Sequence, residues 1–105
     1  TAKFIFINNF TSYGREFRYV PFTEDIPENI AEQDRLLFEA ITEHDKEAFF
    51  AAIKEKMIPI SGYAPMLLYF RLFGDAETEL EQYYLSGDMN GNYKATIGYA
   101  SMIIK

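Results

Sequence analysis

The stretch over residues 65–73, Pro-Met-Leu-Leu-Tyr-Phe-Arg-Leu-Phe, places the strongest limit on how this chain folds. Seven of the eight residues after the proline are apolar, so most sides of the segment have to be buried. A strand in the middle of a sheet and a helix inside a bundle both meet that demand. The segment has the length of a strand, and Gly62 and Gly74-Asp75 bracket it with turn residues. We therefore expect a central strand, with Phe70 in the middle of the core.

An antiparallel pair of helices is predicted before this stretch. The first helix is expected over about 26–43 and the second over about 46–57. Asp25 and Asp45 are residues that favour helix starts, and Pro27 is tolerated in a first turn. The connection between the two helices is short, which favours an antiparallel arrangement. The apolar residues expected to form the buried stripe of the first helix are Ile30, Leu37 and Ile41.

Strands are predicted at both ends of the chain. Residues 3–8 and 15–20 are rich in aromatic or β-branched residues, with turn residues between them. Residues 79–87 and 93–104 form a second candidate pair, joined through Asn90-Gly91. Both residues of an Asn-Gly pair accept positive φ, so this pair is a strong signal for a tight hairpin.

The expected fold is a single domain over residues 1–105, of the α+β class. It has two layers: an antiparallel sheet of about five strands, and the helix hairpin packed on one face, in the order ββααβββ. Gly98 is expected to mark a bulge or a bend in the last strand. The alternative keeps residues 65–85 helical and leaves a smaller sheet.

The charge distribution limits the classes of partner. The formal net charge is −6, and the acidic residues fall in two blocks: residues 23–47 sum to −7 and residues 75–88 to −5. Such a chain is poorly suited to bind nucleic-acid phosphates or anionic lipid. No apolar run reaches membrane-spanning length, and the first residues show no signal-peptide pattern. The sequence has no cysteine, which suits a cytoplasmic location.

Candidate catalytic and metal-binding residues are few. Asp88, Asn90 and Asn92 resemble the opening of a calcium loop, but Tyr93 and Tyr99 stand where its glycine and its acid belong. A hairpin turn that binds no calcium explains them better. His44 is the only histidine and has no cysteine to activate, so a solvated turn residue is favoured over a general base. We expect no catalytic residue, no metal site and no cofactor.

The leading hypothesis is a small, acidic, non-enzymatic module of the inhibitor or immunity type that docks on a basic protein surface. The alternatives are a subunit that pairs with its own copy through a sheet edge, as a homodimer, and a small acid-base enzyme or ligand carrier. Like charges gathered on one face favour steering toward positive charge, and tyrosine is favoured at interfaces. The candidate partner-binding residues are Glu32, Glu39, Glu43, Glu77, Glu79, Glu81, Tyr83 and Tyr84.

Overall fold

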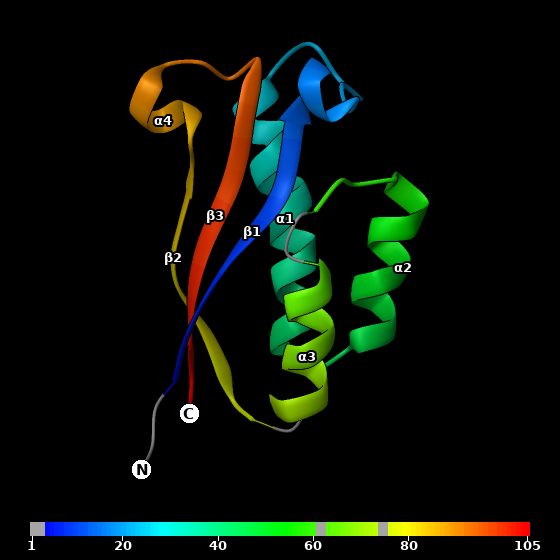
Figure 1. The fold of residues 1–105 in the computed structure, drawn as a ribbon, viewed down its shortest axis with the longest axis vertical. Coiled ribbons are helices and arrows are strands. Elements are labelled where there is room, and N and C mark those ends of the chain that lie inside the picture. Colours follow the sequence, from blue (N-terminus) through cyan, green and yellow to red (C-terminus); the bar gives the residue numbers. More distant parts are fainter. Residues whose placement is uncertain (1–3, 61–62, 74–75) are drawn as a thin grey trace.

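The computed structural model describes residues 4–60, 63–73 and 76–105. Its strands are β1 (Phe4–Gly14), β2 (Thr78–Leu85) and β3 (Ala95–Ile104). Its helices are the 3-10 helix η1 (Arg15–Phe17) and the α-helices α1 (Ile26–Thr42), α2 (Lys46–Lys56), α3 (Tyr63–Phe73) and α4 (Gly87–Asn90). The strands form one antiparallel sheet in the order β1-β3-β2. The three long helices gather on one side of the strands (Figure 1).

The predicted class is confirmed, but the predicted strand count and order are wrong. The chain is α+β with an antiparallel sheet, as expected. Within the described residues the sheet has three strands instead of about five, and the order ββααβββ does not match. Two predicted strands, 15–20 and 65–73, adopt helical or irregular structure instead. The alternative that keeps 65–85 helical and leaves a smaller sheet is correct for residues 65–73 and for the smaller sheet, but it is wrong for residues 78–85, which form β2.

The apolar stretch at 65–73 belongs to α3. A helix needs only one buried side, and here that side consists of Met66, Tyr69 and Phe70, at spacings of three and one. Pro65 lies in the first turn of the helix, where a missing N–H costs nothing. The leucines on the other side remain exposed, namely Leu67, Leu68 and Leu72. The turn residues predicted at Gly62 and Gly74-Asp75 lie outside the described residues.

Phe70 is buried in the core, as predicted, although it stands on a helix. Its ring makes edge contacts with Phe49 and Phe50 of α2 and with Tyr69, at centroid distances of 5.4, 5.8 and 5.2 Å. This aromatic cluster joins α2 and α3. The core therefore lies between the helices and the face of the sheet that carries Ala100, Met102 and Ile104.

The first strand is longer than predicted, and the second predicted strand is absent. The strand expected over 3–8 continues through the polar segment to Gly14, because β3 pairs with it along its length. The strand expected over 15–20 begins as η1, and Arg18 then takes a left-handed conformation with φ 55°. That conformation breaks an extended strand, so only a single bridge between Gly14 and Tyr19 remains.

The predicted tight hairpin at Asn90-Gly91 is also wrong, although the predicted pairing of the two strands around it is correct. β2 and β3 are antiparallel neighbours. The chain between them forms the short helix α4, which Gly91 ends with φ 75°. Gly91 therefore uses its positive φ to end a helix, and not within a two-residue turn.

The helix pair formed by α1 and α2 is confirmed. Asp45 caps α2 as expected, because its side chain accepts a hydrogen bond from the Ala48 N–H at 3.0 Å. Pro27 lies in the first turn of α1. Asp25 does not cap α1 with its side chain; it takes a left-handed conformation with φ 50° instead. The two helices nevertheless begin and end within about one residue of the predicted bounds.

Candidate functional site

The most unusual group in the structure is the carboxyl of Asp34, which is completely buried. Asp34 lies on α1 between Ile30 and Leu37, on the stripe that faces the sheet. Buried carboxyl groups need hydrogen-bond donors, since burial without them is costly. The chain supplies those donors from two strands.

Both oxygens of the Asp34 carboxyl accept hydrogen bonds. Thr11 of β1 donates twice to Oδ1, from its backbone N–H at 3.1 Å and from its hydroxyl at 2.6 Å. Tyr83 of β2 donates its hydroxyl to Oδ2 at 2.6 Å. Asp34 therefore links α1 to both edge strands of the sheet, and it does so across β3.

Two more side chains extend this network toward the surface. Gln33 Nε2 donates to the Thr11 hydroxyl oxygen at 2.9 Å, and Tyr19 donates its hydroxyl to Gln33 Oε1 at 3.0 Å. Every bond is oriented so that the donors point toward the carboxyl at the inner end. We call Tyr19, Gln33, Thr11, Asp34 and Tyr83 the Asp34 network.

Irregularities in the sheet make room for the carboxyl. The register between β1 and β3 shifts between Asn9 and Ser12, so β1 carries one extra residue opposite Gly98 of β3. The shift releases the Thr11 N–H from the β1–β3 ladder, and that N–H binds Asp34 instead. A Cβ at Gly98 would collide with Asp34 Oδ2 and would lie 3.0 Å from the Tyr83 hydroxyl. The predicted bulge near Gly98 thus exists, but its extra residue belongs to β1.

Burial dominates the electrostatics of Asp34. Loss of hydration raises the pKa of the carboxyl from 3.8 to about 6, although the donors Thr11 and Tyr83 act in the opposite direction. Burial also raises the pKa of Tyr83, and the neighbouring Asp34 charge raises it further. The Tyr83 hydroxyl therefore keeps its proton and remains a donor to Asp34.

A hollow of about 480 Å³ opens beside the outer end of the Asp34 network. Tyr19 and Gln33 are part of its wall, but Asp34 and Thr11 are not. Its full lining consists of Tyr19, Pro21, Phe22, Asn29, Glu32, Gln33, Leu36 and Lys56. The inner end of the network therefore faces protein groups only, and the hollow contacts the network through a tyrosine and an amide.

The predicted acidic residues of the first helix form a surface ion-pair chain. Arg35 pairs with Glu32 at 2.6 Å and with Glu39 at 2.9 Å, three residues back and four forward, at the spacings that bring side chains together on a helix. All three side chains are about half exposed. Glu43 follows the last turn of α1 and is exposed. Their role in partner binding stays a prediction.

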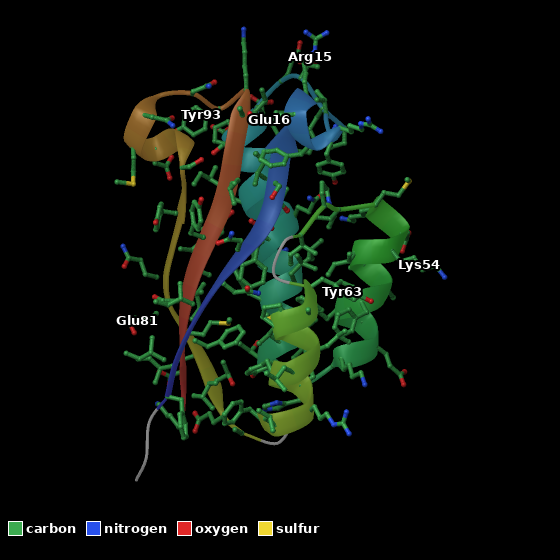
Figure 2. All side chains as sticks on the ribbon, viewed as in Figure 1. Arg15, Glu16, Lys54, Tyr63, Glu81 and Tyr93 are labelled. Atoms are coloured by element: carbon green, nitrogen blue, oxygen red, sulfur yellow. The ribbon has the colours of Figure 1, made fainter. Side chains whose placement is uncertain are left out.

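The second predicted group lies elsewhere and is divided between two faces. Glu77, Glu79 and Glu81 are exposed, and Glu79 pairs with Lys105 at 2.6 Å. Figure 2 shows Glu81 pointing away from the helices, on the opposite side of the molecule from Lys54 of α2. Tyr84 stacks on Tyr99 at 5.3 Å, on the face of the sheet turned away from the helices. Tyr83 points inward to Asp34, so the predicted residues do not form one patch.

The residues that resemble a calcium loop are engaged by the chain itself. Asp88 accepts bonds from the Leu85 N–H at 2.9 Å and from the Tyr93 hydroxyl at 2.5 Å. Asn90 accepts from the Asn92 N–H at 2.8 Å. Among the described residues, no three His, Asp or Glu side chains gather in a group that could hold a metal ion. His44 is exposed between α1 and α2.

Comparison with known proteins identifies the family. The model of the family described as Memo-like protein matches residues 1–103. The chain belongs to the Memo-like family. It is 31% identical over 103 residues to a MEMO1 family protein of Thermococcus kodakarensis, covering 92% of this chain and 35% of that protein. A MEMO1 family protein of Pyrococcus horikoshii gives the same identity and coverage. A MEMO1 family protein of Methanothermobacter thermautotrophicus is 33% identical over 85 residues, which cover 77% of this chain and 31% of that protein.

Membership in the Memo-like family corrects the predicted function. The hypothesis of a separate acidic binding module of the inhibitor or immunity type is wrong, because the family match extends over nearly the whole chain. The chain spans about a third of the length of the curated relatives that it matches. No helix among the described residues is long and apolar enough to cross a membrane.

Proposed function

We propose that this chain is a structural layer of a Memo-like protein and that it catalyses no reaction by itself. The observation that supports this proposal is the Asp34 network, which joins α1 to β1 and β2 through a completely buried carboxyl. Polar networks of this kind fix one arrangement of packed elements when every member is satisfied. In this role Asp34 holds the helix layer in a single register on the sheet.

The orientation of the network supports a positioning role for Asp34 over a catalytic one. A general acid or base has to reach the proton that it transfers in the substrate. Both Asp34 oxygens are instead occupied by Thr11 and Tyr83, and the adjoining hollow contacts only Tyr19 and Gln33 of the network. The carboxyl is therefore placed to organise the protein around it.

Thr11→Val tests this proposal, because valine has the same shape as threonine but has no hydroxyl. The variant leaves Gln33 without its acceptor and removes one donor from Asp34. A structural network predicts a loss of about 1–3 kcal/mol in the free energy of unfolding, measured by urea denaturation. Thr42→Val is the matched control, because Thr42 is exposed at the end of the same helix that carries Asp34.

A gain in stability for Thr11→Val would contradict the structural role. Residues that are retained for activity commonly reduce stability, so their replacement often stabilises a protein. A cytoplasmic location and a partner with a basic surface, or a second copy as a homodimer, stay predictions from the sequence. Their test is separate from that of the Asp34 network.

A further inference from the structure

The two neighbouring strands β1 and β3 contain no charged side chain along their whole length. The side chains of β3 alternate between buried and partly exposed. Its buried residues face the helices, where Ala100, Met102 and Ile104 belong to the core. The residues between them therefore point to the opposite face of the sheet.

That opposite face is apolar over much of its area. In the register of the sheet, Ile5 lies opposite Ile103 and Asn9 lies opposite Tyr99. Ile5 and Ile7 are 68% and 73% exposed, which is unusual for isoleucine in a strand. We define the outer face by Ile5, Ile7, Tyr84, Tyr99, Ser101 and Ile103. Asn9, Gln82 and Glu79 point to the same side, and Glu79 pairs there with Lys105, so the charge on this side is confined to the β2 edge next to Ile103. The long helices α1, α2 and α3 lie on the other side of the sheet (Figure 1).

The outer face also contains a shallow hollow of about 220 Å³. Ile7 and the stacked rings of Tyr84 and Tyr99 line most of it, and Gln82 and Ser101 are the polar residues in its wall. Apolar walls with few polar groups accept an aliphatic or aromatic side chain, and they disfavour a charged one because its desolvation is not compensated. The hollow therefore fits an apolar side chain from a second polypeptide layer.

We propose that the outer face packs against the polypeptide that makes up the remaining part of a Memo-like protein. This inference rests on the proposed function as a structural layer. The curated relatives carry almost two thirds of their length beyond the segment that this chain matches. Among residues 4–60, 63–73 and 76–105, helices cover one face of the sheet and leave the other uncovered. Such a two-layer fold can accept a third layer. The partner surface is uncharged and apolar where it meets Ile5 and Ile7.

The test uses the part of the Thermococcus kodakarensis relative that this chain does not match, as a separate polypeptide. Because that part need not fold by itself, it is co-expressed with this chain, and the complex is purified through a tag on this chain. The parent chain is expected to retain the second polypeptide in equimolar amount. Ile7→Lys is expected to reduce the retained amount by about tenfold or more, because it places a charge in the contact.

Met89→Lys is the matched control, because Met89 is an apolar residue of similar exposure, 80% against 73% for Ile7, and it lies on α4 and not on the outer face. It is expected to bind like the parent. Loss of binding in both variants, full binding by Ile7→Lys, or no binding by the parent would each overturn the proposal. Sedimentation of the chain alone tests whether a second copy covers the outer face instead. A dimer that Ile7→Lys dissociates would show this and would also overturn the proposal.

The two proposals fail in different measurements. A failed complex with a normal loss of stability in Thr11→Val would remove the outer-face contact and leave the structural role of the Asp34 network. A Thr11→Val variant that is more stable than the parent, together with an intact complex, would remove the structural role of the Asp34 network and leave the outer-face contact. Ile7 is exposed on the outer face, whereas Thr11 and Asp34 are buried on the helix side, so each variant reports on its own face of the sheet.

Discussion

Asp34→Asn should change how the stability of this protein depends on pH. The amide keeps an oxygen that can accept from both Thr11 donors, and its NH₂ group can donate to the Tyr83 oxygen. The variant therefore preserves the volume of the site and the bonds from Thr11, removes the charge and the titration, and reverses the direction of the hydrogen bond to Tyr83. We expect it to be at least as stable as the parent at pH 7.

The size of the effect follows from the raised pKa of Asp34. The carboxyl pKa lies at about 6 in the folded protein against 3.8 as its ordinary value. A tenfold change in proton affinity corresponds to about 1.4 kcal/mol, so the buried charge costs the folded state about 3 kcal/mol. Well below about pH 4 the carboxyl is protonated in both the folded and the unfolded chain, and the cost vanishes. The contribution of Asp34 to the free energy of unfolding thus falls as the pH rises from about 4 to 6, and it then stays low.

Urea denaturation of the parent and Asp34→Asn at pH 4, 5, 6 and 7 measures this effect. The free energy of unfolding of the variant, relative to the parent, should rise by about 2–3 kcal/mol over this range. Other carboxyl groups, such as Asp88 with its lowered pKa, titrate in both proteins and largely cancel in the difference. Glu43→Gln removes an exposed carboxyl from the end of the same helix and shows what a change in net charge contributes by itself. If the difference in the free energy of unfolding between Asp34→Asn and the parent does not change with pH, or shifts in favour of the parent as the pH rises, the argument from burial is refuted.

Two further predictions concern packing. Gly98→Ala should lower the free energy of unfolding by about 1–3 kcal/mol or more, since its Cβ would collide with Asp34 Oδ2. The loss should shrink in an Asp34→Ala background, and equal losses in both backgrounds would contradict the proposed clash. Phe70→Ala should cost about 3–5 kcal/mol in a urea melt because Phe70 fills the aromatic cluster of α2 and α3. Leu72→Ala, at an exposed position of α3, should cost less than about 0.5 kcal/mol, and similar costs for the two variants would count against this core.

The helix pair is predictable from the sequence because local signals determine it. Asp45 acts through a hydrogen bond to a residue three positions away, and Pro27 acts through its own ring. Such signals do not depend on which elements meet in space. The ion pairs of Arg35 are predictable for the same reason, since residues three and four positions apart are neighbours on any helix.

The strand predicted at 65–73 is wrong because apolar composition does not distinguish a central strand from a helix with one buried side. That prediction requires Leu67, Leu68 and Leu72 to be buried, and in the structure they are exposed. It also requires this chain by itself to cover every side of the segment. If a larger Memo-like protein supplies further layers, a segment of this chain can carry more apolar residues than its own core needs.

Only Tyr83 of the Asp34 network is among the predicted site residues, as a partner-binding residue, and Asp34 itself is not, although the sequence contains one signal for it. The stripe Ile30, Leu37 and Ile41 has a gap of two turns after Ile30, and Asp34 stands in that gap. A polar residue on a buried stripe has to meet donors, so this position can be identified as a candidate site from the helical spacing of the sequence. The donors cannot be identified from the sequence, since Thr11 and Tyr83 lie 23 and 49 residues away from Asp34.

Three irregularities, each a defect when taken alone, meet at this one point. Asp34 interrupts an apolar stripe, Gly98 weakens a strand, and the extra residue beside Thr11 breaks the register of the sheet. Each irregularity is needed for the other two to form the buried site. Without Gly98 the carboxyl has no space, and without the register shift the Thr11 N–H would stay in the ladder and could not donate to Asp34. Their coincidence lets Asp34 bond to both edge strands, which in the proposed structural role holds the helix layer on the sheet in one register. The local sequence pattern of each element therefore predicts the helices, but it does not predict the Asp34 network, which depends on three separate elements.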